Sequence, residues 1–169
     1  MTPPAHPDSP LAGTAASGTE RRPRPEIRAT VACVIQRGGR FLMVEEDRGG
    51  PCTVFNQPAG HIEAGEGPLA AVRREVAEET AWEVTLDGYL GLYVFELNGL
   101  TFHSHGFIAS PARFLDTPLD DDIHAAHWLT PDALKALDAA GRLRSPRVLP
   151  RMEDARSGRL FPLDVIHEG

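Results

Sequence analysis

From residue 27 onward, apolar positions first occur in two short runs separated by a glycine pair. Residues 28–36 are rich in Thr, Val and Ile, residues 41–45 are again apolar, and Gly38-Gly39 lies between the runs. Two such runs about a glycine turn predict a β-hairpin. The following segment, 47–58, contains two glycines and two prolines and is expected to be irregular.

The hydrophobic period changes to that of a helix after residue 67. Leu69, Val72 and Val76 are spaced i, i+3 and i+7 and therefore lie on one helical face. A proline in the first turn and a glycine at the cap position are typical of a helix start. The pattern predicts a helix over 68–80.

The second half of the chain alternates between strand and helix patterns. Strands are predicted at 82–96, 100–109 and 126–129, and helices at 131–140 and 147–157. Asn98-Gly99 is a strong hairpin turn signal, and Thr130 is placed to cap the helix that follows it. This mixture predicts an α/β fold in which a mixed β-sheet is covered by helices.

The N-terminal residues differ in composition from the rest. Residues 1–25 hold six of the 15 prolines, no aromatic residue, and only two large apolar side chains. Such a stretch buries too little apolar surface to offset its ordering entropy. We expect residues 1–26 to be a disordered tail and residues 27–169 to form one domain, which suits a chain of 169 residues.

Charge and composition exclude several classes of protein. The net charge of −7 argues against a protein that coats nucleic-acid polymers, although a bound metal can still recruit a small phosphorylated ligand. No apolar run is long enough for a membrane span, and the N-terminus lacks a secretory signal pattern. Cys33 and Cys52 have no CxxC spacing, so we expect reduced thiols and a cytoplasmic location.

Three glutamates of the 68–80 helix carry the clearest chemical signal. Glu75, Glu78 and Glu79 lie at i, i+3 and i+4, share one side of the helix, and flank its apolar face. Like charges at this spacing repel, and a hard divalent cation such as Mg²⁺ relieves that repulsion. The alternative is an ordinary surface helix in which Arg74 pairs with Glu78.

A longer pattern surrounds these glutamates. The chain contains Gly60-x5-Glu66-x7-Arg74-Glu75-Val76-x-Glu78-Glu79-x-Ala81-Trp82. This spacing resembles the signature of the Nudix hydrolases, except that Ala81 replaces the second glycine of that signature. The segments TVACVIQRGGRFLMVEE, FNQPAGHIEAGE and LRSPRVLPRMEDARSGRLFPLDVI are similar to the NudJ group of phosphatases within the family. The resemblance covers about residues 29–166 and implies the Nudix α/β/α sandwich.

The resemblance also implies roles for the residues of the signature. The implied Mg²⁺ ligands, with Mn²⁺ as a substitute, are Glu75, Glu78, Glu79 and the backbone carbonyl of Gly60. Arg74 would orient a carboxylate, either Glu66 or Glu75. One glutamate of the signature is a candidate general base, and the sequence leaves open which one.

The implied activity is Mg²⁺-dependent hydrolysis of phosphoanhydrides in nucleoside di- and triphosphates or in thiamine-pyrimidine pyrophosphate. Alternatives within the family are pyrophosphatases for ADP-ribose, nucleotide sugars or dinucleoside polyphosphates. A further alternative is a sensor that binds a nucleotide without cleaving it. The expected partner is a small phosphorylated substrate, with no nucleic-acid polymer and no membrane, and the expected state is a monomer or homodimer.

Additional pocket candidates lie outside the helix. His61 follows Gly60 and is a candidate pocket residue. The resemblance also implies acids of the site at Asp120 and Asp122. A solvated loop at these two positions is an equally weighted alternative to a role in the pocket. His103 and His105 share one face of a predicted strand; we prefer a polar strand face, in reach of the pocket, to a zinc site. Six arginines within 142–159 form a basic patch, which we interpret as a surface feature in preference to phosphate ligands.

Deletion of residues 2–25 should leave the melting temperature and the turnover nearly unchanged, because this stretch offers almost no apolar surface to bury. Thermal unfolding and steady-state hydrolysis of the full-length and shortened chains provide the measurement. A loss of several degrees in melting temperature would show that the segment packs on the domain.

Overall fold

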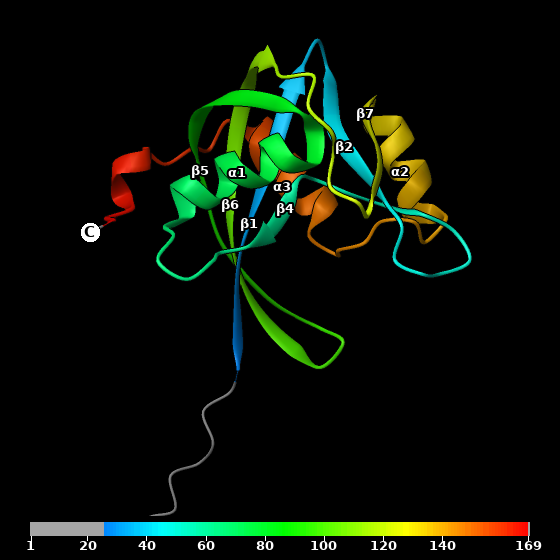
Figure 1. Cartoon of the computed structure of the whole chain (residues 1–169), viewed down its shortest axis with the longest axis horizontal. Helices are drawn as coiled ribbons and strands as arrows, with labels where there is room; N and C mark the ends of the chain where they lie inside the picture. The colour runs from blue at the N-terminus through cyan, green and yellow to red at the C-terminus, as the bar shows by residue number, and fades with distance from the viewer. Residues whose placement is uncertain (1–25, 169) are drawn as a thin grey trace, which may run out of the picture.

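The computed structural model describes residues 26–168, which form a mixed β-sheet between helices (Figure 1). The expected α/β/α sandwich is confirmed. Except for Glu26, the predicted tail lies outside the described residues. The elements are β1 (Ile27–Arg37), β2 (Arg40–Glu46), β3 (Val54–Asn56), β4 (Ala59–His61), α1 (Pro68–Thr80), β5 (Trp82–Leu97), β6 (Leu100–Phe114), β7 (Ile123–Leu129), α2 (Pro131–Ala139), α3 (Val148–Ser157) and the 3-10 helix η1 (Leu163–Val165).

Strand β1 organises the sheet because it pairs with three other strands. The main order is β3-β2-β1-β6-β5, in which β1 and β6 are parallel and the other neighbours are antiparallel. At the hairpin end β1 pairs with β2, from Gln36 opposite Phe41. Nearer its start it pairs with β4, where Val31 lies opposite Gly60. The change of partner places β4, and with it Gly60, beside residues 30–32 of β1.

Alternating side chains of β1 supply both layers of the core. Val31 and Cys33 face α1 and pack with its apolar residues Val72 and Val76. Val34 faces the other way, into a cluster formed with side chains of α2 and α3, Leu134, Val148 and Met152. Figure 1 shows α1 in front of the sheet and α3 behind it. The buried β1 residues therefore pack against helices on both faces of the sheet.

Most predicted elements are present with small changes at their ends. The predicted helix over 68–80 is α1, and Thr130 caps α2 by accepting a hydrogen bond from the Ala133 N–H. The expectation of an irregular 47–58 segment was wrong in part, because β3 lies within it. Phe55 of β3 exchanges backbone hydrogen bonds with Arg142 and Arg144 across 87 to 89 positions of sequence, a contact that local pattern does not reveal.

Two further sequence expectations concern the cysteines and the membrane. Cys33 is buried in the core and Cys52 is exposed, and both thiols are free. Burial raises the pKa of the Cys33 thiol well above its ordinary value. Among residues 26–168, no helix combines the length and the apolar character that crossing a bilayer requires.

Candidate active site

Arg74 of α1 forms hydrogen bonds with one acidic residue before the helix and two within it. Its Nε and Nη2 donate to the two carboxylate oxygens of Glu66, both at 2.8 Å. Its Nη1 donates to Glu75 at 2.8 Å and to Glu78 at 3.0 Å, and Nη2 also reaches the His61 carbonyl at 3.0 Å. Arg74 therefore contacts both carboxylates named as its candidate partners, and it fixes the 61–66 loop against α1.

Glu79 is buried on the face of α1 that lies against β4. Its Oε2 accepts a hydrogen bond from the Ala59 backbone N–H at 2.8 Å. Burial, with the nearby carboxylates Glu46 and Glu75, raises the pKa of Glu79 to about 9. The protein alone thus favours the protonated acid at neutral pH, and a cation beside Glu79 would favour the carboxylate.

Glu75 packs directly on the backbone of Gly60. An ideal Cβ placed on Gly60 would lie 2.1 Å from the carboxyl carbon of Glu75, far inside van der Waals contact. Burial is the main cause that raises the pKa of Glu75, and Arg74 opposes it. The close approach therefore requires a glycine at this position, and it places a backbone segment next to a buried carboxylate.

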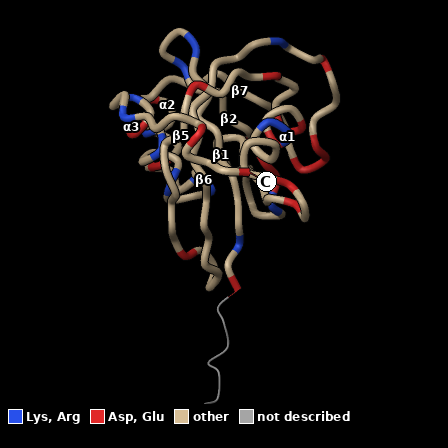
Figure 2. Tube along the Cα trace, turned by 90° about the vertical axis from the view of Figure 1, so that its left-hand side faces the viewer, with Lys and Arg blue, Asp and Glu red and all other residues tan. Residues whose placement is uncertain are grey.

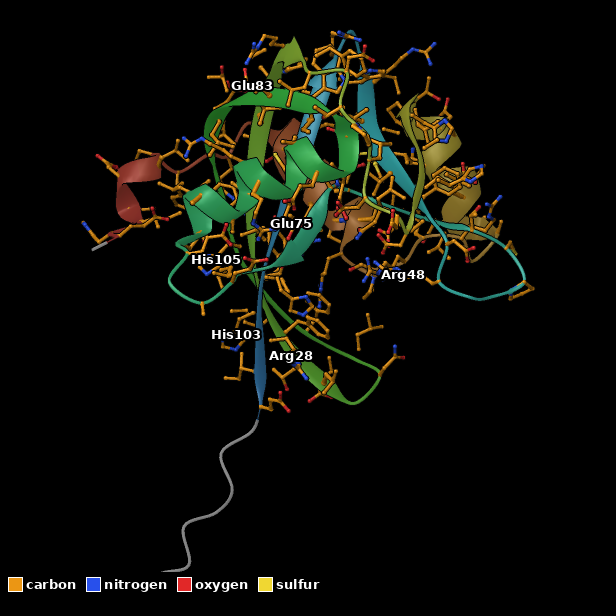
Figure 3. All side chains as sticks on the ribbon, in the orientation of Figure 1. Arg28, Arg48, Glu75, Glu83, His103 and His105 are labelled. Atoms are coloured by element: carbon orange, nitrogen blue, oxygen red, sulfur yellow. The ribbon has the colours of Figure 1, made fainter. Side chains whose placement is uncertain are left out.

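Both glutamates face a cavity of about 340 Å³. Its wall is formed by residues from both halves of the chain: Thr30, Val31, Arg48, Asn56, Ala59, Gly60, His61, Glu63, Glu75, Glu79, Phe95, Leu97, Phe102, Ser104, Asp120, Asp122, Arg144, Ser145 and Arg151. Glu75 lies under α1, beside β4 (Figure 3). Glu78 is not part of the wall, and its side chain is 44% exposed where it meets Arg74.

The loop before β7 brings two more acids to the cavity. The Asp120 N–H donates to the Glu78 carbonyl at 3.1 Å, which ties the loop to the last turn of α1. Asp122 lies 3.3 Å from a guanidinium nitrogen of Arg48. Burial and neighbouring carboxylates, first Glu78, raise the pKa of Asp120. The structure thus places Asp120 and Asp122 in the cavity wall, as it does His61.

Sequence reasoning missed Glu46, the acid that anchors the opposite wall. Its side chain is fully buried at the end of β2, and its Oε2 accepts hydrogen bonds from Arg48 and Arg144. Its Oε1 has no partner among residues 26–168. The sequence did offer one signal for a functional acid here, because the charged residue Glu46 directly follows the apolar run 41–45. The pair Arg144–Glu46 holds the segment before α3 against β2.

Two sequence interpretations need correction. The basic patch of 142–159 is not only a surface feature, because Arg144 and Arg151 line the cavity and Arg151 is buried. The side chains of His103 and His105 are not part of the cavity wall. Strand alternation directs them to the opposite face from Ser104, and His105 Nδ1 instead meets the Tyr89 hydroxyl at 3.0 Å. Figure 3 shows both imidazoles on β6, below Glu75.

Charge is distributed unevenly over the domain. Figure 2 shows acidic segments gathered around α1 and basic segments around α3, with the sheet between them. Of the three arginines in the cavity wall, Arg48 and Arg144 pair with the buried Glu46, and Arg48 also pairs with Asp122, whereas Arg151 belongs to α3.

Comparison with known proteins agrees with this arrangement. The family model of the NUDIX domain matches residues 25–152. The chain belongs to the Nudix family. Phosphatase NudJ of Escherichia coli K12 is 34% identical over 139 residues, which cover 81% of this chain and 88% of NudJ. The chain is accordingly a hydrolase that acts on phosphoanhydrides.

Solved structures show the same Nudix fold. The NUDIX hydrolase from Nitrosomonas europaea superposes with a TM-score of 0.80 at 35% identity, over 86% of this chain and 98% of that one. The MutT protein from Methanosarcina mazei shares the fold at a TM-score of 0.64 and 18% identity, over 82% and 99% of the two chains. Ala81, which stands for a glycine of the Nudix signature, still adopts the left-handed conformation at the end of α1, with φ of 55°.

Nudix hydrolases generally use divalent metal ions, so the question for this cavity is whether its side chains offer ligands for one. No group of three His, Cys, Asp or Glu side chains within residues 26–168 is arranged to hold a metal. Mg²⁺, however, is commonly bound through one or two carboxylates together with water and substrate phosphates. Glu75 and Glu79, buried side by side against backbone, provide such oxygen donors. The residues present therefore fit a hard divalent cation.

Replacing Gly60 with Ala should lower phosphoanhydride hydrolysis about 10-fold or more, because the new methyl group would displace the Glu75 carboxylate. The kinetics of hydrolysis and the melting temperature of the purified variant provide the measurement. Gly50→Ala is the matched control, since a Cβ there meets only the Cys52 carbonyl at 3.7 Å. Equal activity of the two variants would contradict the proposed importance of the Gly60–Glu75 contact.

Proposed function

We propose that this Nudix hydrolase is a Mg²⁺-dependent phosphatase of nucleoside di- and triphosphates or of thiamine-pyrimidine pyrophosphate, with Mn²⁺ as a substitute metal. The observation that carries the proposal is the pair Glu75 and Glu79, buried together in the cavity wall with raised pKa values. Two acids in this setting are stabilised as carboxylates by a bound cation. The 34% identity to phosphatase NudJ supports the choice of reaction.

In this proposal some residues of the site bind the cation, and others hold those residues in position. Glu75, Glu79 and the Gly60 carbonyl would hold Mg²⁺, with Glu78 at the rim of the site. When bound, Mg²⁺ supplies charge neutralisation at phosphoryl oxygens and activation of the attacking water. Arg74 fixes Glu66, Glu75 and Glu78 in place through its hydrogen bonds. His61, Asp120 and Asp122 line the same cavity, and in this proposal they contact a bound phosphate chain or its waters.

Glu79→Gln should lower turnover about 100-fold or more at saturating Mg²⁺ while the fold is retained. The amide keeps the side-chain volume and an oxygen that can accept from the Ala59 N–H, but it loses the negative charge. Glu78→Gln is expected to have the same direction of effect. Steady-state hydrolysis and circular dichroism provide the measurements.

The matched control is Glu83→Gln. Glu83 pairs with Arg113 on the surface and lies far from Glu75 in Figure 3. The Glu83→Gln variant should keep wild-type turnover. Full turnover by Glu79→Gln would rule out Glu79 as a Mg²⁺ ligand, because the reaction would then need no negative charge at that position.

Hydrolysis in ¹⁸O-labelled water identifies the bond that is cleaved. If water attacks the terminal phosphorus of a nucleoside triphosphate, the label should enter free orthophosphate. Mass spectrometry of orthophosphate, pyrophosphate and nucleoside monophosphate gives the answer. If pyrophosphate is the only phosphate product, the phosphatase proposal is wrong, while membership of the Nudix family is unaffected. Cleavage restricted to ADP-ribose, nucleotide sugars or dinucleoside polyphosphates would indicate a pyrophosphatase instead.

A further inference from the structure

The cavity extends beyond the carboxylates to a second end formed by β5, β6 and α3. Phe95 and Phe102 are opposite each other in the β5–β6 pairing, and their rings stack at 5.3 Å between centroids. Both rings line the cavity, as do Ser104 and Arg151. This end therefore combines an apolar aromatic wall with hydrogen-bond donors, and none of these residues takes part in the function proposed above.

Arg151 is the unusual member of this set because it is a buried cation without an anionic partner. Its side chain is 2% exposed, and no carboxylate of residues 26–168 lies within 4.0 Å of it. Burial lowers the pKa of Arg151 to about 10, so the group stays charged at neutral pH. Burying a charge is costly unless it is paired. The guanidinium is therefore placed for a partner that the described residues do not provide.

The contacts that Arg151 makes leave most of its donors free. Its Nη2 donates to Ser104 Oγ at 2.7 Å, and its guanidinium lies over the Tyr93 ring at 4.9 Å. Its Nε has no partner among residues 26–168. A guanidinium carries five N–H donors, so one hydrogen bond and one ring contact do not saturate it. The group keeps donor capacity for a ligand in the cavity.

The sheet register gives the distance between the two ends of the cavity. Thr30 of β1 lies opposite His61 of β4 on one side and opposite Ser104 of β6 on the other. Ser104 is thus two strand spacings, about 10 Å, from His61, the neighbour of Gly60 in β4. Consecutive phosphates share a bridging oxygen and lie much closer together than this. When a diphosphate is bound at Glu75 and Glu79, the part of the substrate that reaches Ser104 is the organic group.

We infer that Arg151, Ser104, Phe95 and Phe102 form the subsite for the heteroaromatic ring of the substrate. The ring lies against the two phenylalanines, and its carbonyl or ring-nitrogen acceptors accept hydrogen bonds from Arg151 and Ser104. A guanidinium suits such adjacent acceptors because its donors form a planar fork. This inference rests on the proposed function for the position of the phosphates, and it assigns Arg151 a role in specificity and none in the cleavage step.

The test compares two uncleavable ligands in the presence of Mg²⁺: guanosine methylenediphosphonate, which carries the ring, and methylenediphosphonate, which lacks it. Arg151→Met keeps the apolar stem and removes the donors. By calorimetry, it should weaken binding of the guanosine ligand about 10-fold or more and change binding of methylenediphosphonate less than about twofold. Ser104→Ala should act in the same direction with a smaller effect. Arg151→Lys should restore only part of the affinity, since it keeps the charge without the planar fork.

The matched control is Arg156→Met on the same helix, where the side chain is 49% exposed and pairs with Glu153. It should leave both affinities unchanged. The inference is overturned if Arg151→Met weakens both ligands alike, if it weakens neither, or if the wild-type protein binds the guanosine ligand no more tightly than methylenediphosphonate. Because neither ligand is hydrolysed, these results are independent of the product analysis that tests the proposed phosphatase activity.

Discussion

The burial of Glu75 and Glu79 against the backbone of β4 is the constraint on which the site depends. Glu79 accepts the Ala59 N–H, and Glu75 occupies the space that a side chain at Gly60 would fill. Burial is the main cause that raises the pKa values of both carboxyl groups, because surroundings of low dielectric disfavour the ionised form, and nearby carboxylates add to the effect. This cost makes the pair responsive to a cation, and the fold around it keeps the two groups from moving apart.

The fold meets this constraint by using β1 as a shared partner. Its pairing with β4 presents Gly60 to α1, and its core residues Val31 and Cys33 hold α1 by the apolar face that adjoins the glutamates. Arg74 then binds the loop before the helix through Glu66 and the His61 carbonyl. The Asp120 loop is attached to the other end of α1. Contacts on three sides of α1 thus hold the two glutamates in place.

The sequence predicted the local elements of the site well, because their signals are local. The 68–80 helix, with its glutamates and its arginine, follows from hydrophobic period and residue spacing over 13 residues. It predicted the far wall poorly. Glu46 and Arg144 meet across 98 positions, and Arg151 meets Ser104 across 47. Arg144 and Arg151 belong to a basic patch that the sequence suggests is on the surface, but in the fold they line the cavity. The periodicity of a short helix such as α3 does not reveal which of its faces the sheet covers.

Binding of a cation by Glu75 and Glu79 is tested most directly by anomalous diffraction from crystals of the protein soaked with Mn²⁺, which reports the position of the cation itself. We expect an anomalous peak within coordination distance of carboxylate oxygens of both Glu75 and Glu79, next to Gly60. The same crystals of Glu79→Gln should show the peak lost or strongly reduced. A peak bound only by other residues, or none at Glu75 and Glu79 at saturating Mn²⁺, would show that these two glutamates do not hold the cation.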